Sequence, residues 1–325
     1  MKGLQAPPRE ETPSRIFARF AMLLVMLAVF AIIVWAAVIN QRISLAEDLR
    51  IDAIEDIDLE VTEGVTFAVD DRGDGDTPVF LFHDVNIAGG VMFESLVDSF
   101  NGEVRTVAVD LPGFGFSTRF PSEGLHHSVR GMAERIGPVI EARAEGPVIV
   151  VGVGLGGEVA AELAATRPDL VAGLVMIDVD FYGDGSMVHA LEALPWVGTA
   201  MTNAFEVSGR FSESSRHPYC AEGGHCLTPN QSRIRDLAGE VVGTTHSLQA
   251  FRSTPAASNV PSRLIDIAAP TVVVWSEKGP VPEDSIDRLV DAMPDARFEA
   301  FDVYEAVHEE PDQVARVIAS LIPEA

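Results

Sequence analysis

The strongest constraint on the fold is a regular alternation of short β-branched runs with stretches of helical apolar spacing. This order predicts parallel strands joined by crossover helices. The expected strands are 78–83, 104–109, 147–151, 173–178, 271–275 and 297–303. The expected helices are 91–100, 128–143, 157–166, 282–293 and 312–322. The pattern therefore predicts an α/β protein with a mostly parallel, doubly wound sheet.

Residues 64–325 contain no internal repeat, and we expect them to form one domain. The interval 182–261 breaks the alternation, because it is weakly helical and interrupted by Gly, Ser and Pro. Insertions of this kind usually lie over the strand ends. The sequence therefore predicts a helical lid there.

Residues 20–39 form an uninterrupted apolar run, FAMLLVMLAVFAIIVWAAVI. As a helix, this run spans roughly the 30 Å hydrocarbon core of a bilayer. A cleaved signal peptide is the alternative, but its apolar region is usually shorter and ends in small residues, whereas this run continues into Asn40-Gln41-Arg42. We predict one uncleaved transmembrane helix at 20–39, with a tail at 1–19 and a stalk at 40–63.

The distribution of charge predicts the orientation of this helix. Lys2, Arg9, Arg15 and Arg19 precede it, and only Arg42 follows it closely. The positive-inside rule then places the N-terminus in the cytoplasm and the large domain outside the cell membrane. The whole chain has 23 Lys+Arg against 49 Asp+Glu, a formal net charge of −26, which repels nucleic acid.

Three segments resemble a known superfamily: PVFLFHDVNIAGGVMFESLVDSF from residue 78, VRTVAVDLPGFGFSTR from 104 and PVIVVGVGLGGEVAAELAATRPDLVAGLVMID from 147. Their order resembles that of cap-bearing α/β-hydrolase superfamily members, such as serine hydrolases, epoxide hydrolases and haloalkane dehalogenases. PTVVVWSEKGPVPED and VHEEPDQVARVIASLI fit the last two strand–helix units. The resemblance implies an α/β-hydrolase fold over residues 66–322.

The same resemblance implies a nucleophile on a G-x-Nuc-x-G turn, with an acid and a histidine on later loops. The turn reads Gly152-Val153-Gly154-Leu155-Gly156, so the nucleophile position is Gly154. The acid position aligns with Gly279 and the histidine position with Tyr304. None of these three residues can perform its expected role. Glycine also adopts the strained turn conformation at little steric cost.

A fourth departure concerns the oxyanion hole. Family members commonly have His-Gly after the first core strand, whereas this chain has His83-Asp84. A carboxylate where negative charge develops would raise the barrier. The resemblance places His83, Asp84 and Leu155 at the pocket and the oxyanion hole.

Two other residues could restore part of a catalytic set. Asp178 ends the strand at 173–178, a position from which some relatives supply the acid, and His308 follows Tyr304 by four residues. A structural role is favoured for both. A water activated by His83, Asp84, Asp178 or His308 stays conceivable, but no spacing typical of metal ligands supports a metal site. We expect no cofactor.

The predicted lid contains a cluster of His217, Cys220, His225 and Cys226. A disulfide between Cys220 and Cys226 is favoured over free thiols, and a zinc site is the least favoured of the three interpretations. Trp196 lies in an apolar patch that either packs on the body or lines an apolar pocket.

The sequence favours a membrane-anchored, extracytoplasmic pseudoenzyme that binds an apolar small molecule or a membrane protein partner. One alternative is an ester or epoxide hydrolase with a relocated catalytic set. A further alternative is a structural accessory subunit whose acidic face docks a basic partner in a membrane complex.

Overall fold

The computed structural model describes residues 13–43, 58–62, 64–120, 127–182, 197–201, 228–253 and 260–323. Helix α1 (Pro13–Ile43) includes the window Ala21–Val38, whose mean hydropathy of 2.9 and length suffice to cross a membrane. A signal sequence would share these properties. The helix therefore agrees with the predicted apolar span without choosing between anchor and signal.

Eight strands form one sheet in the order β1-β2-β4-β3-β5-β6-β7-β8. The first three in chain order are β1 (Asp58–Thr62), β2 (Val65–Arg72) and β3 (Val79–Phe82). The others are β4 (Thr106–Val109), β5 (Val148–Val153), β6 (Val171–Ile177), β7 (Thr271–Ser276) and β8 (Arg297–Phe301). Pairing is antiparallel for β1–β2 and β2–β4 and parallel elsewhere. The predicted mostly parallel sheet is confirmed.

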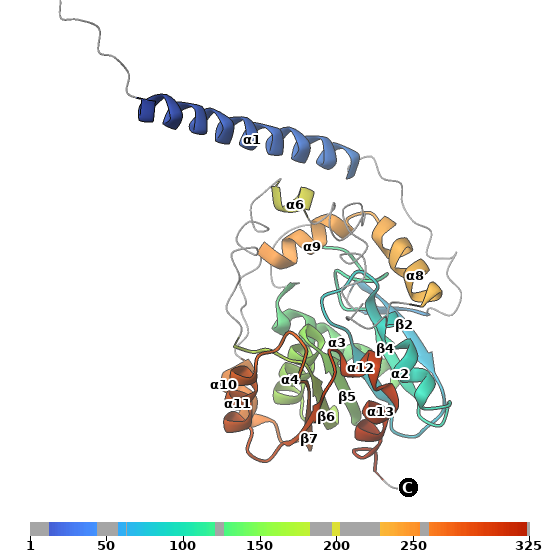
Figure 1. Ribbon diagram of the computed structural model, residues 1–325. Helices are drawn as coiled ribbons and strands as arrows, with labels where there is room; N and C mark the ends of the chain where they lie inside the picture. Colours follow the sequence, from blue (N-terminus) through green and yellow to red (C-terminus); the bar gives the residue numbers. More distant parts are fainter. Residues whose placement is uncertain are drawn as a thin grey trace, which may run out of the picture.

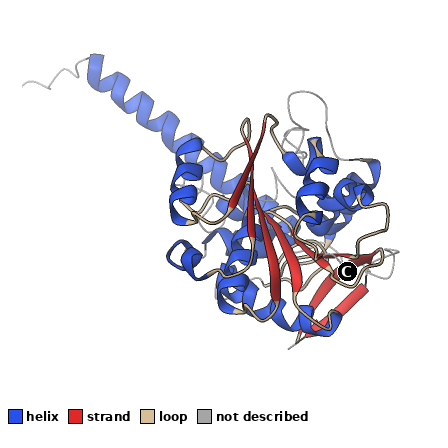
Figure 2. Cartoon of the chain, turned by 90° about the horizontal axis from the view of Figure 1, so that it is seen from below, coloured by secondary structure: helices blue, strands red, loops and turns tan. Residues whose placement is uncertain are grey.

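Helices cover both faces of the sheet, as Figure 2 shows. One face packs against α3 (Val129–Arg143), α4 (Leu155–Thr166) and α11 (Glu283–Ala292). The other packs against η2 (Gly89–Phe93), α2 (Glu94–Ser99), α12 (Ala306–Glu309) and α13 (Pro311–Ala319). Central strands such as β3 and β5 are buried along their whole length, which explains their continuous apolar sequences.

The edge of the sheet begins earlier than predicted. β1 lies within residues 40–63, which we expected to be a stalk, and it pairs with β2 over its full length. All of its residues are exposed or half-buried, so it lacks the apolar run that marked the central strands.

The insertion between β6 and β7 contributes α6 (Val197–Met201), α8 (Pro229–Glu240), α9 (Thr244–Ser253), α10 (Val260–Arg263) and η5 (Leu264–Asp266). Figure 1 shows α6 and α9 between α1 and the body of the domain. α8 contacts η2, which follows β3, and α9 binds the loop that follows β4. These described parts of the insertion therefore lie at the carboxyl ends of the strands.

Candidate active site

The turn between β5 and α4 forms the centre of the site. Gly154 has φ 49° and ψ −116°, a conformation that disfavours an L side chain. A Cβ at Gly156 would overlap the Phe82 carbonyl, so the turn packs directly against the end of β3. The backbone thus keeps a sharp strand-to-helix turn although residue 154 bears no reactive group.

The Asp84 carboxylate fills the space beside Gly154. A Cβ built on Gly154 would overlap this carboxylate. Asp84 Oδ1 accepts a hydrogen bond of 2.9 Å from the N–H of Leu155, the residue after the expected nucleophile. Asp84 therefore occupies the space of a side chain at residue 154, where the resemblance implied a nucleophile, and it binds one donor of the expected oxyanion hole.

Burial raises the pKa of Asp84, while hydrogen bonds from the backbone N–H groups of Leu155 and Val85 act in the opposite direction. These two donors favour the ionised form in an otherwise unfavourable environment. A serine at residue 154 would not restore the usual site by itself, because its Cβ would meet the Asp84 side chain.

His83 is a structural residue in this arrangement. Its Nε2 accepts a hydrogen bond of 2.9 Å from Leu111 N–H, which assigns the ring proton to Nδ1, 2.6 Å from the Asp84 carbonyl oxygen. Burial lowers the pKa of His83 to about 4. The sequence placed His83 at the pocket, but its neutral ring is fully buried and lies outside the cavity lining.

Asp178 is fixed by the end of β7. Its Oδ2 accepts a 2.7 Å hydrogen bond from the Ser276 hydroxyl, and its Oδ1 accepts another from the Ser276 N–H. Burial is the main reason that its pKa rises to about 6. The structural role favoured for Asp178 agrees with these bonds, although the residue also borders the cavity.

A cavity of about 50 Å³ lies at this end of the sheet. Its polar lining residues are Asp84, Asp178, Glu305 and His308, and its apolar ones are Met92, Val153, Pro280 and Val307. The His308 side chain is only 10% exposed and therefore does not point into solvent. Its Nε2 lies 3.7 Å from Glu305 Oε2.

Glu305 is the residue that sequence reasoning missed. Burial and the nearby carboxylates of Asp178, Asp84 and Glu309 raise its pKa to about 8. Glu158, on the first turn of α4, has a pKa raised to about 7 by burial and by Asp84 and Asp180. The signal for Glu305 was its position beside Tyr304, which the resemblance aligned with the catalytic histidine.

The other predicted positions have different surroundings. Tyr304 is 37% exposed and does not line the cavity. Its carbonyl oxygen lies close to Gly279, where a Cβ would be 2.8 Å away. Trp196, His217, Cys220, His225 and Cys226 lie outside the described residues. In the part of the chain that is described, no three His, Cys, Asp or Glu side chains form a group that could hold a metal ion.

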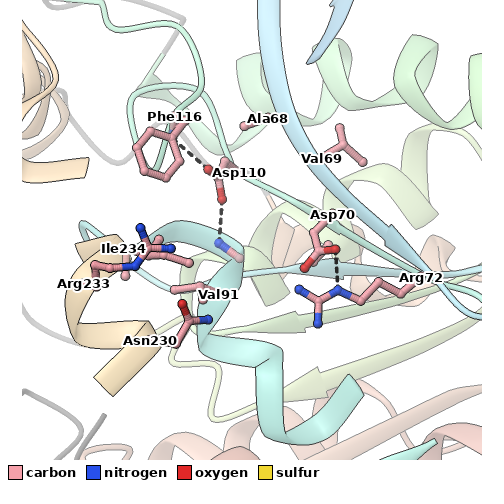
Figure 3. A pocket seen from close by; sticks show the side chains of 13 residues that line it. Ala68, Val69, Asp70, Arg72, Val91, Asp110, Phe116, Asn230, Arg233 and Ile234 are labelled. Atoms are coloured by element: carbon pink, nitrogen blue, oxygen red, sulfur yellow. Dashed lines mark hydrogen bonds and ion pairs between the residues drawn. The ribbon is translucent and has the colours of Figure 1, made fainter. Parts of the chain in front are cut away.

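A larger cavity of about 150 Å³ lies between β2, η2 and α8. Figure 3 shows Arg72 and Asp70 on one side and Arg233 and Asn230 on the other. Arg72 Nε lies 2.7 Å from Asp70 Oδ1. The Asp110 carboxylate accepts hydrogen bonds from the N–H groups of Gly90 and Phe116. Charges of both signs are mixed there, and the described residues that line this cavity form no nucleophile–base arrangement that would mark it as the reaction centre.

The sheet order and the sharp turn after β5 are those of the α/β-hydrolase fold. The sequence profile of the alpha/beta hydrolase family matches residues 79–317. The chain is 33% identical over 129 residues to 2-(acetamidomethylene)succinate hydrolase of Mesorhizobium japonicum, covering 40% of this chain and 45% of that protein. It is 45% identical over 73 residues to an esterase of Mycobacterium tuberculosis, covering 22% and 24%.

A solved structure of E-2-(acetamidomethylene)succinate hydrolase superposes with a TM-score of 0.61 and 20% identity, covering 82% of this chain and 98% of that one. The match to each of the two curated relatives spans less than half of that protein's length. The chain belongs to the alpha/beta hydrolase family, as the resemblance implied. Its relatives are hydrolases, which favours the alternative of a relocated catalytic set over an inactive protein.

Proposed function

We propose that this protein is a hydrolase in which the Asp84 carboxylate replaces the missing nucleophile of residue 154. The observation that carries the proposal is the position of that carboxylate. It fills the space of a side chain at residue 154 and is oriented by Leu155 N–H. A carboxylate can act as a nucleophile that forms a covalent ester.

The occupied Leu155 N–H favours attack on a saturated carbon over attack on an ester carbonyl. Acyl transfer needs free donors for the substrate's developing oxyanion, whereas Leu155 N–H already binds Asp84. Opening of an epoxide has no such requirement at the carbon under attack. The geometry therefore supports an epoxide-type hydrolase better than an esterase.

Glu305 supplies the proton for ring opening. Its raised pKa of about 8 keeps it protonated at neutral pH, and it borders the same cavity as Asp84. An Asp84 oxygen attacks a ring carbon, the ring C–O bond breaks, and the ring oxygen takes the Glu305 proton. The product of this step is a hydroxyalkyl ester of Asp84 and an ionised Glu305.

His308 activates the water that hydrolyses this ester. It takes a proton from water, and the water oxygen attacks Asp84 Cγ. Leu155 N–H then stabilises the oxyanion that forms at Asp84 Oδ1, the oxygen to which it already donates. The Cγ–O ester bond breaks, and the leaving alkoxide takes the proton from His308. The carboxylic acid formed at Asp84 returns a proton to Glu305, so epoxide and water give a diol.

Replacing Asp84 tests this proposal. Asp84→Asn removes the nucleophile, and we expect turnover of an epoxide panel to fall by about a thousandfold or more. Asp98→Asn is the matched control, because Asp98 is an exposed carboxylate on α2. Equal activity of the folded Asp84→Asn variant and the wild type would exclude Asp84 as nucleophile.

A non-catalytic binding protein is the second candidate function. The bare Gly154 and the carboxylate on Leu155 N–H favour it, since both oppose acyl chemistry. This candidate predicts no turnover by the wild type of ester, epoxide or alkyl halide panels, together with saturable binding of an apolar ligand. Measurable turnover that Asp84→Asn abolishes would exclude it.

Helix α1 determines where the protein is located in the cell in this proposal. Its apolar window would anchor the protein in the cell membrane with the domain outside, as the basic residues before it indicate. The full chain should stay with membranes after an alkaline wash, and protease added outside intact cells should digest the domain. Release by the wash would indicate that the helix is not an anchor.

A further inference from the structure

Helix α6 of the insertion packs against the C-terminal half of α1. Ala36 of α1 and Ala200 of α6 are buried at this contact, with exposed fractions of 1% and 0%, and Trp35 packs beside them. Large apolar side chains elsewhere on α1, from Met22 to Val34, are exposed. Two alanines permit a close approach of helices within or beside a bilayer.

The position of this contact along α1 places α6 near one membrane surface. Ala36 lies two residues before Val38, which ends the apolar window. Two residues of helix correspond to about 3 Å. With the N-terminus in the cytoplasm, α6 would lie at the outer boundary of the hydrocarbon core.

A continuous series of contacts leads from α6 to the candidate active site. α6 packs on α9, and the Phe251 ring of α9 lies 5.6 Å from Phe114 in an edge-to-face contact. Phe114 makes a second edge-to-face contact of 5.5 Å with His83, the neighbour of Asp84. The insertion therefore connects α1 with the strand end that holds the carboxylate.

The lining of the cavity limits the charge of the group that reacts. Asp84, Asp178 and Glu305 border it, and among the described residues that line it none is Lys or Arg. An anionic group would enter without a cationic partner, at a cost in desolvation. The apolar side chains of Met92, Val153 and Val307 suit a neutral hydrocarbon group.

We propose that α1 docks α6 at the membrane surface, so that the candidate active site takes neutral epoxide substrates dissolved in the bilayer. The choice of substrate rests on the proposed function, whereas the contact between α1 and α6 does not. α1 then packs against the insertion through α6 and also anchors the domain in the membrane.

Crosslinking tests the contact without any need for activity. Ala36→Cys combined with Ala200→Cys, in full-length protein with Cys220→Ser and Cys226→Ser, should give a disulfide in membranes that links the two peptides in mass spectra. Ala28→Cys with Ala200→Cys is the control, because Ala28 is exposed and lies about 12 Å further along the helix. Equal crosslinking of both pairs, or none of the first, would overturn the contact.

Turnover in phosphatidylcholine nanodiscs tests the substrate class. Ala36→Leu overfills the contact and should reduce turnover of a long-chain epoxide dissolved in the bilayer by about tenfold, with turnover of a short soluble epoxide unchanged. Ala37→Leu is the matched control, since Ala37 is the exposed neighbour. Equal loss on both substrates, or no loss on the long one, would overturn membrane delivery.

The two proposals fail in different ways. A specific disulfide in the Ala36→Cys/Ala200→Cys variant, together with wild-type protein that opens neither epoxide, would contradict the proposed function and the substrate class while the helix contact stands. Wild-type protein that opens both epoxides, together with no specific disulfide in the double-cysteine variant, would leave the proposed function intact and remove the docking of α6 on α1.

Discussion

Residues 84 and 154 depend on each other. A side chain at residue 154 would overlap the Asp84 carboxylate. Because Gly154 has no side chain, Asp84 can reach Leu155 N–H. Gly154 also has a positive φ, which an L residue adopts only with strain. The glycine at residue 154 and the position of the carboxylate of residue 84 are therefore sterically coupled.

Glu305 gives a prediction that distinguishes leaving groups. Glu305→Gln removes the proton donor, so epoxide turnover should fall by about a hundredfold. The leaving group of an alkyl halide departs as a halide ion and takes no proton. Turnover of the alkyl halide by Glu305→Gln should therefore stay close to that by the wild type. Steady-state rates with a matched epoxide and alkyl halide provide the measurement.

The pH dependence of the same reaction gives a second readout. Wild-type epoxide turnover should decline as the pH rises through about 8, where Glu305 loses its proton. Glu305→Gln should lack this decline, and the exposed Glu283→Gln on α11 should retain it. If Glu305→Gln lost epoxide turnover and alkyl halide turnover equally, Glu305 would have only a structural role.

At the scale of elements, Ser276 joins the ends of β6 and β7 to the start of α12. Its buried hydroxyl donates to Asp178 and accepts a 2.9 Å hydrogen bond from Ala306 N–H. Ser276→Ala leaves both partners without this bond and should lower the free energy of unfolding by about 2 kcal/mol or more. Chemical denaturation is the measurement.

Ser320→Ala controls for the loss of a hydroxyl, because Ser320 is exposed at the end of α13. Its effect on unfolding should stay within about 0.5 kcal/mol. Ser276→Ala with an equally small effect would contradict the view that Ser276 fixes α12, which carries His308.

The central strands and their helices could be predicted because burial on both faces produces continuous apolar runs. The half-covered β1 lacks such a run, and its residues were assigned to a stalk. The turn at Gly154 was implied by the resemblance of residues 152–156 to the family's nucleophile turn. The meeting of Asp84 with Leu155 N–H depends on how loops from distant strands pack, which no local pattern encodes. Glu305 and His308 are only three residues apart, but their position at the same cavity as Asp84 and Asp178 also depends on that packing.

At the scale of the whole molecule, raised carboxyl pKa values make stability depend on pH. The pKa rises to about 6 for Asp178, about 7 for Glu158 and about 8 for Glu305, from ordinary values of 3.8 for Asp and 4.5 for Glu. The folded state then binds these protons more tightly than the unfolded state. The stability that these three carboxyl groups contribute is greatest near their ordinary pKa values and is lost as the pH rises to about 8.

Thermal unfolding of the protein should reflect this sign. We expect Tm to be higher at pH 5 than at pH 8 by roughly 3 °C or more. Glu305→Gln should reduce this difference, and Glu283→Gln should not. A higher Tm at pH 8 would contradict the raised pKa values at the site. Asp71, whose pKa is lowered with Arg105 and Arg143 as partners, affects stability only at more acidic pH.

The path of one oxygen atom distinguishes attack by Asp84 from direct attack by water. Repeated turnover of an epoxide in heavy-oxygen water, followed by digestion and mass spectrometry, should place heavy oxygen in the peptide that contains Asp84, because water attacks Asp84 Cγ. The first turnover should give a diol whose new oxygen comes from the protein. An unlabelled Asp84 peptide with heavy oxygen in the first diol would mean that water attacks the substrate directly, and would contradict the account.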